Sequence, residues 1–244
     1  MRGLTSAEVV ALWESGQCEP AARRALTLLA PVCPGETWQT LARLSLGERD
    51  ARLLELRERT FGSRLLSIGH CPACGETIEA DFELSDLRAP RTKVEPLAEV
   101  QHREGSARFR LLDTFDLEAA ADARDAGRAR LTLIERCIIE PRDAAGQKLA
   151  ARELPPELLD AVAAKIAAAD PQSDVNLSLN CPACRQDWQA PFDIAGYFWV
   201  ELQACARRLL REVHEIAAAY GWREADILAL TPARRAAYLE LVRG

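Results

Sequence analysis

The chain has 244 residues, of which 48% are hydrophobic and 28% charged, and its net charge is -6 at pH 7. This size allows one ample core, and no run of about 18 uninterrupted apolar residues predicts a membrane span. The first ten residues lack the basic end and apolar middle of a secretory signal, so we expect a cytoplasmic protein. The acidic balance argues against a nucleic-acid binder, because such proteins usually carry a basic excess.

The N-terminal quarter of the chain has the sequence pattern of helices. Ser6 can cap a first helix, and residues 20–29 form a second one that stops before a proline. A third helix begins at Ser45, which forms a capping-box pattern with Glu48, and ends at Phe61. We therefore predict a helical N-terminal region over residues 1–63.

After residue 63 the hydrophobic period changes from that of a helix to that of a strand. Residues 64–87 read as strand, Cys71-Pro72-Ala73-Cys74, strand, and residues 174–194 repeat this order around Cys181-Pro182-Ala183-Cys184. Each cysteine pair therefore lies in the turn of a predicted hairpin. The two stretches form an internal pseudo-repeat.

The four knuckle cysteines, Cys71, Cys74, Cys181 and Cys184, have the spacing of a structural metal site. Two residues between the cysteines of each pair let both thiolates bind one ion, and two pairs make the four-sulfur tetrahedral site that zinc prefers. Catalytic zinc usually keeps an open position, whereas four sulfurs close the coordination sphere. We therefore predict one structural zinc per chain, in a discontinuous zinc ribbon made of both hairpins.

The segment between the hairpins, residues 88–173, is too long for a loop and is predicted to be a mainly helical insertion. Residues 88–106 carry prolines and charges and are expected to be irregular, and residues 109–112 suit a short strand. Residues 128–139 suit a helix, although their β-branched content would also suit a strand. The other predicted helices cover residues 116–126 and 155–169.

The C-terminal region, residues 195–244, reads as helices, the longest over residues 195–220. Gly221 is placed to end it, and shorter helices follow over residues 223–229 and 231–242. The long helix has one apolar stripe: Phe198, Leu202, Cys205, Leu209, Val213 and Ile216. Its aromatic run, residues 197–199, together with Trp188 and Trp222, suits either core packing against the second hairpin, which we favour, or a partner-binding patch.

The remaining chemically active residues show no catalytic pattern. His70 precedes Cys71 and is expected to lie outside the sulfur shell, and neither His102 nor His214 has a catalytic partner set. Cys137 and Cys205 lie on apolar stripes as small core residues, and Cys18 and Cys33 lack metal spacing. The sequence contains no phosphate loop, dinucleotide fingerprint, nucleophile elbow or zinc-protease helix. We expect a protein without enzymatic activity.

Several of these short motifs, in this order, resemble one family: the baseplate hub assembly proteins of contractile-tailed (T-even) phages, also found in phage-like contractile injection systems. The similar features are residues 46–50 leading to Phe61-Gly62, both CPAC knuckles with the strands that follow them, and the tail segments 208–214, 220–222, 226–230 and 234–241. The resemblance implies a non-enzymatic role in building the baseplate or its hub. One departure is Arg185, which stands where the first knuckle has Gly75.

These observations predict a mostly helical α+β protein with a four-cysteine zinc ribbon, a helical insertion and flanking terminal helices. The resemblance implies other baseplate, hub or tail proteins as partners, without a small-molecule substrate, a membrane or nucleic acid. One alternative is a zinc-ribbon module that binds nucleic acid or acts in transcription. The other is a dithiol oxidoreductase, although such a cysteine pair normally lies where a strand meets a helix.

Overall fold

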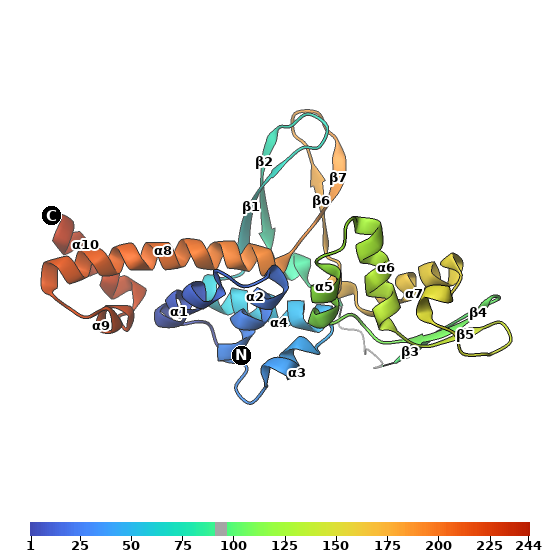
Figure 1. Ribbon diagram of the computed structural model, residues 1–244. Coiled ribbons are helices and arrows are strands. Elements are labelled where there is room, and N and C mark those ends of the chain that lie inside the picture. The colour runs from blue at the N-terminus through green and yellow to red at the C-terminus, as the bar shows by residue number, and fades with distance from the viewer. Residues whose placement is uncertain (91–96) are drawn as a thin grey trace. The chain divides into compact units, whose positions relative to one another are not determined.

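The computed structural model describes residues 1–90 and 97–244, so residues 91–96 of the segment predicted to be irregular lie outside the described residues. The chain divides into two compact units (Figure 1). The first comprises residues 1–35, 53–62 and 194–244, and the second residues 36–52 and 63–193. Among the described residues, no helix is both long and apolar enough to cross a membrane.

The first unit is built from helices. They are α1 (Ser6–Gly16), α2 (Ala21–Leu29), the last turns of α4 (Leu46–Phe61), α8 (Ile194–Tyr220), α9 (Glu224–Leu228) and α10 (Pro232–Arg243). All were predicted close to these bounds. The prediction for the first cap was wrong, because Thr5 rather than Ser6 caps α1: the Thr5 hydroxyl accepts from the Glu8 amide, and the Glu8 carboxylate accepts from the Thr5 amide.

Helix α8 supplies the core of the first unit, and α1, α2, α9 and α10 all pack against it. Phe198 is fully buried and meets Phe61 edge to face at 5.8 Å between ring centroids. Trp199 is buried over Gly16, where a Cβ atom would collide with the indole ring. Trp222 is partly exposed and stacks on Tyr220 instead. The aromatic residues of the C-terminal region therefore divide between the core and the surface.

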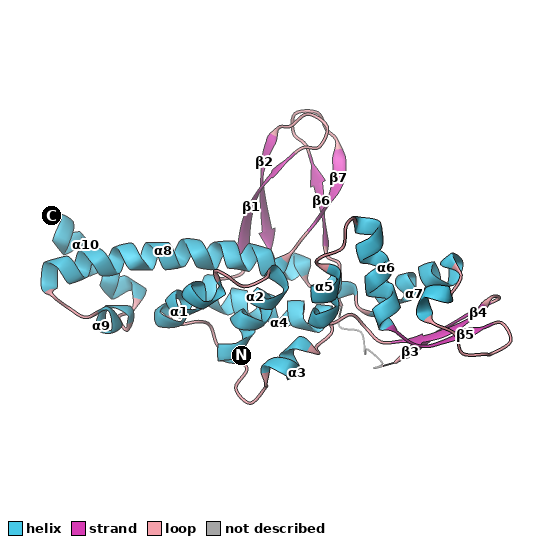
Figure 2. Cartoon of the chain, viewed as in Figure 1, coloured by secondary structure: helices cyan, strands magenta, loops and turns pink. Residues whose placement is uncertain are grey.

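The second unit combines helices with small antiparallel sheets (Figure 2). Its helices are α3 (Trp38–Ala42), the first turns of α4, α5 (Thr114–Ala120), α6 (Ala126–Cys137) and α7 (Pro156–Ala169). Its strands are β1 (Arg64–His70), β2 (Thr77–Glu83), β3 (Ala98–His102), β4 (Gly105–Phe109), β5 (Ile138–Asp143), β6 (Asn176–Asn180) and β7 (Asp187–Pro191). The protein is thus α+β, as predicted.

The insertion contains a three-stranded sheet that the sequence did not predict. Strands β3, β4 and β5 pair antiparallel in that order, whereas residues 98–106 were expected to be irregular and residues 109–112 to form the strand. The inward positions of β4 are Gly105, Ala107 and Phe109, and two of them are too small to give an apolar alternation. This sheet and helices α6 and α7 share one core around Phe109, Cys137 and Leu158.

Two helix predictions in the second unit differ from the structure in their bounds, and one helix was not predicted. Residues 128–139 do form a helix, α6, although its last two predicted residues belong to β5. The helix predicted over residues 116–126 is α5, which ends at Ala120, and Asp125 then caps α6 through the Arg128 amide at 2.8 Å. The short helix α3, capped by Thr37, was not predicted.

Helix α4 begins at a close contact between segments far apart in sequence. Ser45 accepts from the Glu48 amide at 3.2 Å, as the capping-box pattern predicts. The Gly47 amide donates to the Asp170 carboxylate at 2.9 Å, so a residue at the end of α7 satisfies an unpaired donor of α4. A Cβ atom at residue 47 would collide with that carboxylate. A larger residue at position 47 would therefore push the Asp170 carboxylate away from the amide that it accepts from.

Candidate metal centre

The two predicted hairpins are present and bring their knuckles together. Strand β1 pairs with β2 from Arg64 opposite Glu83 to His70 opposite Thr77, and Cys71 follows at once. Strand β6 pairs with β7 in the same manner, and Cys181 follows it. Figure 1 shows the two hairpins converging at their turns. Along each strand, burial alternates with a period of two, so each hairpin has one partly buried and one exposed face.

The first knuckle is a tight turn held by backbone hydrogen bonds. The Cys71 amide donates to the Glu76 carbonyl at 2.9 Å, and the Gly75 amide donates to the Cys71 carbonyl at 2.9 Å. Gly75 has a φ of +75°, in the left-handed region that glycine occupies without steric cost. These bonds place the backbone amides of Ala73 and Cys74 toward the Cys71 sulfur.

The second knuckle reproduces this turn with a different residue at its strained position. The Cys181 amide donates to the Gln186 carbonyl at 2.9 Å, and the Arg185 amide donates to the Cys181 carbonyl at 2.8 Å. Arg185 has a φ of +61° and is the one non-glycine residue with a positive φ among the described residues. The left-handed conformation costs an L-residue about 1–2 kcal/mol. Arg185 in place of a glycine therefore adds strain to the turn, while the backbone follows the same course as in the first knuckle.

The structure gathers the four predicted ligand residues into one cluster. Their sulfur atoms all lie within 4.8 Å of one another, and the distances from Cys71 to Cys184 and from Cys74 to Cys181 are both 3.6 Å. A disulfide would need sulfurs about 2.05 Å apart, so these cysteines are unbonded thiols. Zinc–sulfur bonds of about 2.3 Å in a tetrahedron place sulfurs about 3.8 Å apart. The cluster can therefore hold a metal ion, and its donor set fits zinc.

The electrostatics of the cluster favour a cation among the sulfurs. Burial raises the pKa of Cys71. The backbone amides of Cys74 and Ala73 and the Cys184 thiol together have a larger, opposite effect, and the resulting pKa is about 7. The Glu76 amide lowers the pKa of Cys74, but the Cys184 thiol and burial outweigh it and raise that pKa to about 12. The cluster thus favours one thiolate, at Cys71, and opposes a second at Cys74, and a divalent cation would offset the repulsion between thiolates.

Among the described residues, the other cysteines and the histidines are not members of this four-sulfur group. Cys137 is buried, and burial raises its pKa to about 12, consistent with its predicted place in a core. Cys205 is half-buried, Cys33 is buried and Cys18 is exposed. His70 is exposed, with its Nδ1 atom 3.4 Å from the Thr77 hydroxyl, as expected for a residue outside the sulfur shell.

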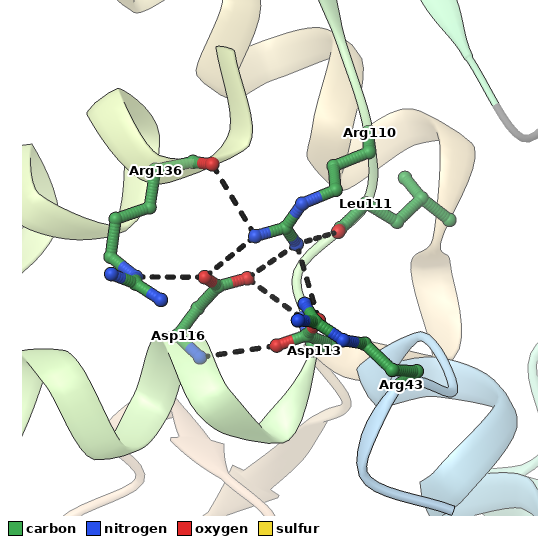
Figure 3. Close-up of polar contacts among 6 residues, drawn as sticks. All are labelled: Arg43, Arg110, Leu111, Asp113, Asp116 and Arg136. Atoms are coloured by element: carbon green, nitrogen blue, oxygen red, sulfur yellow. Dashed lines mark hydrogen bonds and ion pairs between the residues drawn. The ribbon is translucent and has the colours of Figure 1, made fainter. Parts of the chain in front are cut away.

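The structure also contains an ion-pair cluster that the sequence did not reveal (Figure 3). Asp116 is fully buried and accepts from Arg110 at 2.6 and 2.8 Å and from Arg136 at 2.9 Å. Asp113 caps α5 and pairs with Arg43 at 2.9 Å. These contacts join α3, α5 and the end of α6. Arg110, Asp113 and Asp116 lie three residues apart in sequence, but no short motif links them to Arg43 and Arg136, which lie far away along the chain among many other charges.

The charge of Asp116 is maintained by its two arginines. Burial alone would raise its pKa, but the hydrogen bonds from Arg110, the Asp113 amide and Arg136 lower it below the usual range of an aspartate. Because the folded state holds this carboxylate ionised, its contribution to stability is complete above the unfolded pKa, near 3.9, and is lost as pH falls through the lower folded value. We assign this cluster a structural role in the second unit.

Comparison with known families decides the relationship of the chain. Residues 27–199 match the model of the T4 bacteriophage base plate protein family, which covers more than half of the chain and includes both knuckles. The chain belongs to this family. The resemblance noted in the sequence is therefore confirmed at the level of T4-like baseplate proteins. Searches with this chain among curated proteins and among solved structures found no significant match.

Proposed function

We propose that this protein is a structural or assembly component of the baseplate or hub of a contractile phage tail or a phage-like injection system. The single observation that carries the proposal is the family match over residues 27–199. It acts through contacts with other baseplate, hub or tail proteins, and it is made in the cytoplasm of the producing cell. It has no enzymatic activity in this proposal.

The proposal includes a structural zinc held by Cys71, Cys74, Cys181 and Cys184. The distances among the four sulfur atoms support it. Four thiolates would fill a tetrahedral shell and leave no position for substrate, so the metal would serve as a cross-link. Bound zinc would join hairpins separated by more than a hundred residues, and closing so long a loop removes much entropy from the unfolded chain.

We also propose the domain organisation expected from the sequence. Residues 64–87 and 174–194 form a discontinuous zinc ribbon, and residues 88–173 are inserted into it. Residues 1–63 and 195–244 are the flanking helical regions. The independent core of the insertion supports treating it as a separate part.

Deleting the gene and imaging tail particles by electron microscopy tests the assembly role. We expect baseplates to be absent or incomplete, and a plasmid copy of the wild-type gene to restore them. Normal, complete baseplates in the deletion strain would refute the proposal. A plasmid carrying the Cys71→Ser gene adds a second test, because loss of the ribbon should prevent restoration.

The runner-up function, nucleic-acid binding, makes a different prediction. Phosphate contacts produce gel shifts that weaken steeply with salt. The net charge of -6 and the acidic side chains of β2 (residues 79, 81 and 83) oppose such contacts. We therefore expect no salt-sensitive shift of DNA or RNA by the zinc-loaded protein.

A further inference from the structure

The exposed face of hairpin β1–β2 carries an unusual combination of side chains, and we call it the first-hairpin face. Every residue on this face is exposed: Arg64, Leu66, Ile68 and His70 on β1, and Thr77, Glu79, Asp81 and Glu83 on β2. Leu66 is 66% exposed and Ile68 is 70% exposed. Water therefore reaches most of the surface of two large aliphatic side chains that lie two positions apart on one strand.

Acidic side chains run beside this apolar pair. Leu66 lies opposite Asp81 and Ile68 opposite Glu79 in the strand register. Arg64 is the counter-charge on the same face, and its ion pair lowers the pKa of Asp81. The face therefore presents two aliphatic groups next to three carboxylates and one guanidinium group.

The second hairpin shows that a zinc-ribbon hairpin of this type does not need exposed aliphatic residues. Its exposed face consists of Asn176, Ser178, Asn180, Asp187, Gln189 and Pro191. Counted back from the first cysteine of each knuckle, Leu66 corresponds to Asn176 and Ile68 to Ser178. Counted forward from the same cysteines, Glu79 corresponds to Gln189. The same turn and pairing are thus built with a polar, nearly uncharged face, so the aliphatic and acidic residues of the first hairpin are additions to the fold.

We propose that the first-hairpin face docks another protein of the assembly through a segment that carries aliphatic side chains flanked by lysine or arginine. This inference rests on the proposed assembly function and adds the chemistry of the partner. Exposed apolar side chains rimmed by polar ones mark protein interaction sites, and the carboxylates select a basic neighbour. A second copy of this chain fits less well, because apposed first-hairpin faces would bring more carboxylates than guanidinium groups together.

The test replaces the first-hairpin residues by those of the second hairpin. The variant Leu66→Asn/Ile68→Ser removes the aliphatic groups, and Glu79→Gln removes one charge. The matched control is Asn176→Ala/Ser178→Ala on the other hairpin. Zinc content and circular dichroism establish that each variant is folded, and unchanged values are expected because all five positions are exposed.

The binding probe is the tail subassembly purified from the gene-deletion strain and immobilised on a sensor surface. We expect Leu66→Asn/Ile68→Ser to weaken binding of the zinc-loaded protein by tenfold or more, since two buried aliphatic contacts are lost. Glu79→Gln should weaken binding a few-fold and flatten its salt dependence. The control variant should bind like the wild type.

Failure of this inference is distinguishable from failure of the proposed function. If the wild type binds and both aliphatic and control variants bind equally, the docking face is wrong while the assembly role stands. If the wild type does not bind and the deletion strain makes normal baseplates, both are wrong. Sedimentation supplies a further outcome: a wild-type dimer that Leu66→Asn/Ile68→Ser converts to a monomer would make a second copy the occupant and overturn the proposal.

Discussion

The two CPAC hairpins share a backbone and differ in nearly everything that faces solvent. Both turns use the same pair of backbone hydrogen bonds, and both place two cysteines in one sulfur cluster. Their exposed faces are aliphatic and acidic in one case and polar in the other. The comparison separates what the fold requires, which is repeated, from what only one hairpin carries. The repeated part is the cysteine knuckle, and the unrepeated part is the candidate for recognition.

If the two knuckles are equivalent, removing one sulfur from either of them should have the same effect, and this is the largest effect we expect. Cys71→Ser and Cys181→Ser should each lower zinc content from one per chain to near zero, because a structural site needs all four ligands. Amide hydrogen exchange in strands β1, β2, β6 and β7 should become fast in both variants. Elemental analysis and exchange mass spectrometry measure these effects.

The exposed Cys18 provides the matched control for the serine variants, and Cys18→Ser should keep its zinc. Full zinc occupancy in either knuckle variant would remove that residue from the site. A loss confined to one knuckle would break the proposed equivalence of the hairpins.

Removing zinc from the wild type with a chelator should change the reactivity of the knuckle cysteines toward thiol reagents just as strongly. Cys74 and Cys184 are exposed, yet a bound zinc would protect them from thiol reagents. We expect Cys18 to be labelled in the zinc-loaded protein and the knuckle cysteines to be labelled only after a strong chelator is added. Mass spectrometry of the labelled peptides identifies the sites. Fast labelling of Cys74 without chelator would instead favour the dithiol oxidoreductase.

A smaller effect is expected in the insertion, whose cohesion does not depend on the sulfur cluster. Asp116→Asn should lower the free energy of unfolding by about 2–3 kcal/mol, because it leaves two arginines without their buried carboxylate. Zinc content should not change. Denaturant titration measures the loss, and Asp122→Asn at an exposed position is the control.

The same variant should alter the response to acid. The pKa of Asp116 is lowered on folding, so wild-type stability should fall as pH drops below about 4, whereas Asp116→Asn should lack this component. Thermal unfolding at several acidic pH values is the measurement. Parallel pH profiles for the two proteins would show that the carboxylate is not held ionised.

The smallest expected effects lie in the two turns. Gly75→Ala should destabilise the first hairpin by about 1 kcal/mol, because alanine resists a positive φ. Arg185→Gly should do the opposite in the second hairpin and stabilise it by up to about 1 kcal/mol. Zinc affinity measured by chelator competition reports both changes. Gly69→Ala, in strand β1, is the control and should be near neutral, and equal effects of the two turn variants would contradict the shared geometry.

The sequence predicted the parts of the structure that depend on local pattern. Helices with strong apolar stripes, such as α8, and the hairpins with their cysteine spacing were found where expected. The sheet around β4 was missed because Gly105 and Ala107 occupy inward positions without a hydrophobic signal. The ion-pair cluster of Asp116 was missed because Arg43 and Arg136 reach it only through tertiary packing, although the capping box of Asp113 and Asp116 is a local signal. Capping by Thr5 rather than Ser6 reflects two neighbouring residues with nearly equal capping ability.

The distance between the knuckles along the chain also governs the order in which the protein can form. Cys74 leaves the ribosome 107 residues before Cys181, a delay of about 5–20 s at usual rates of synthesis. Asp170, which caps α4, is likewise synthesised 123 residues after Gly47. The insertion, by contrast, draws its core from residues within its own span and can fold during the wait. Its folding then shortens the path between the two cysteine pairs before their four sulfur atoms come together.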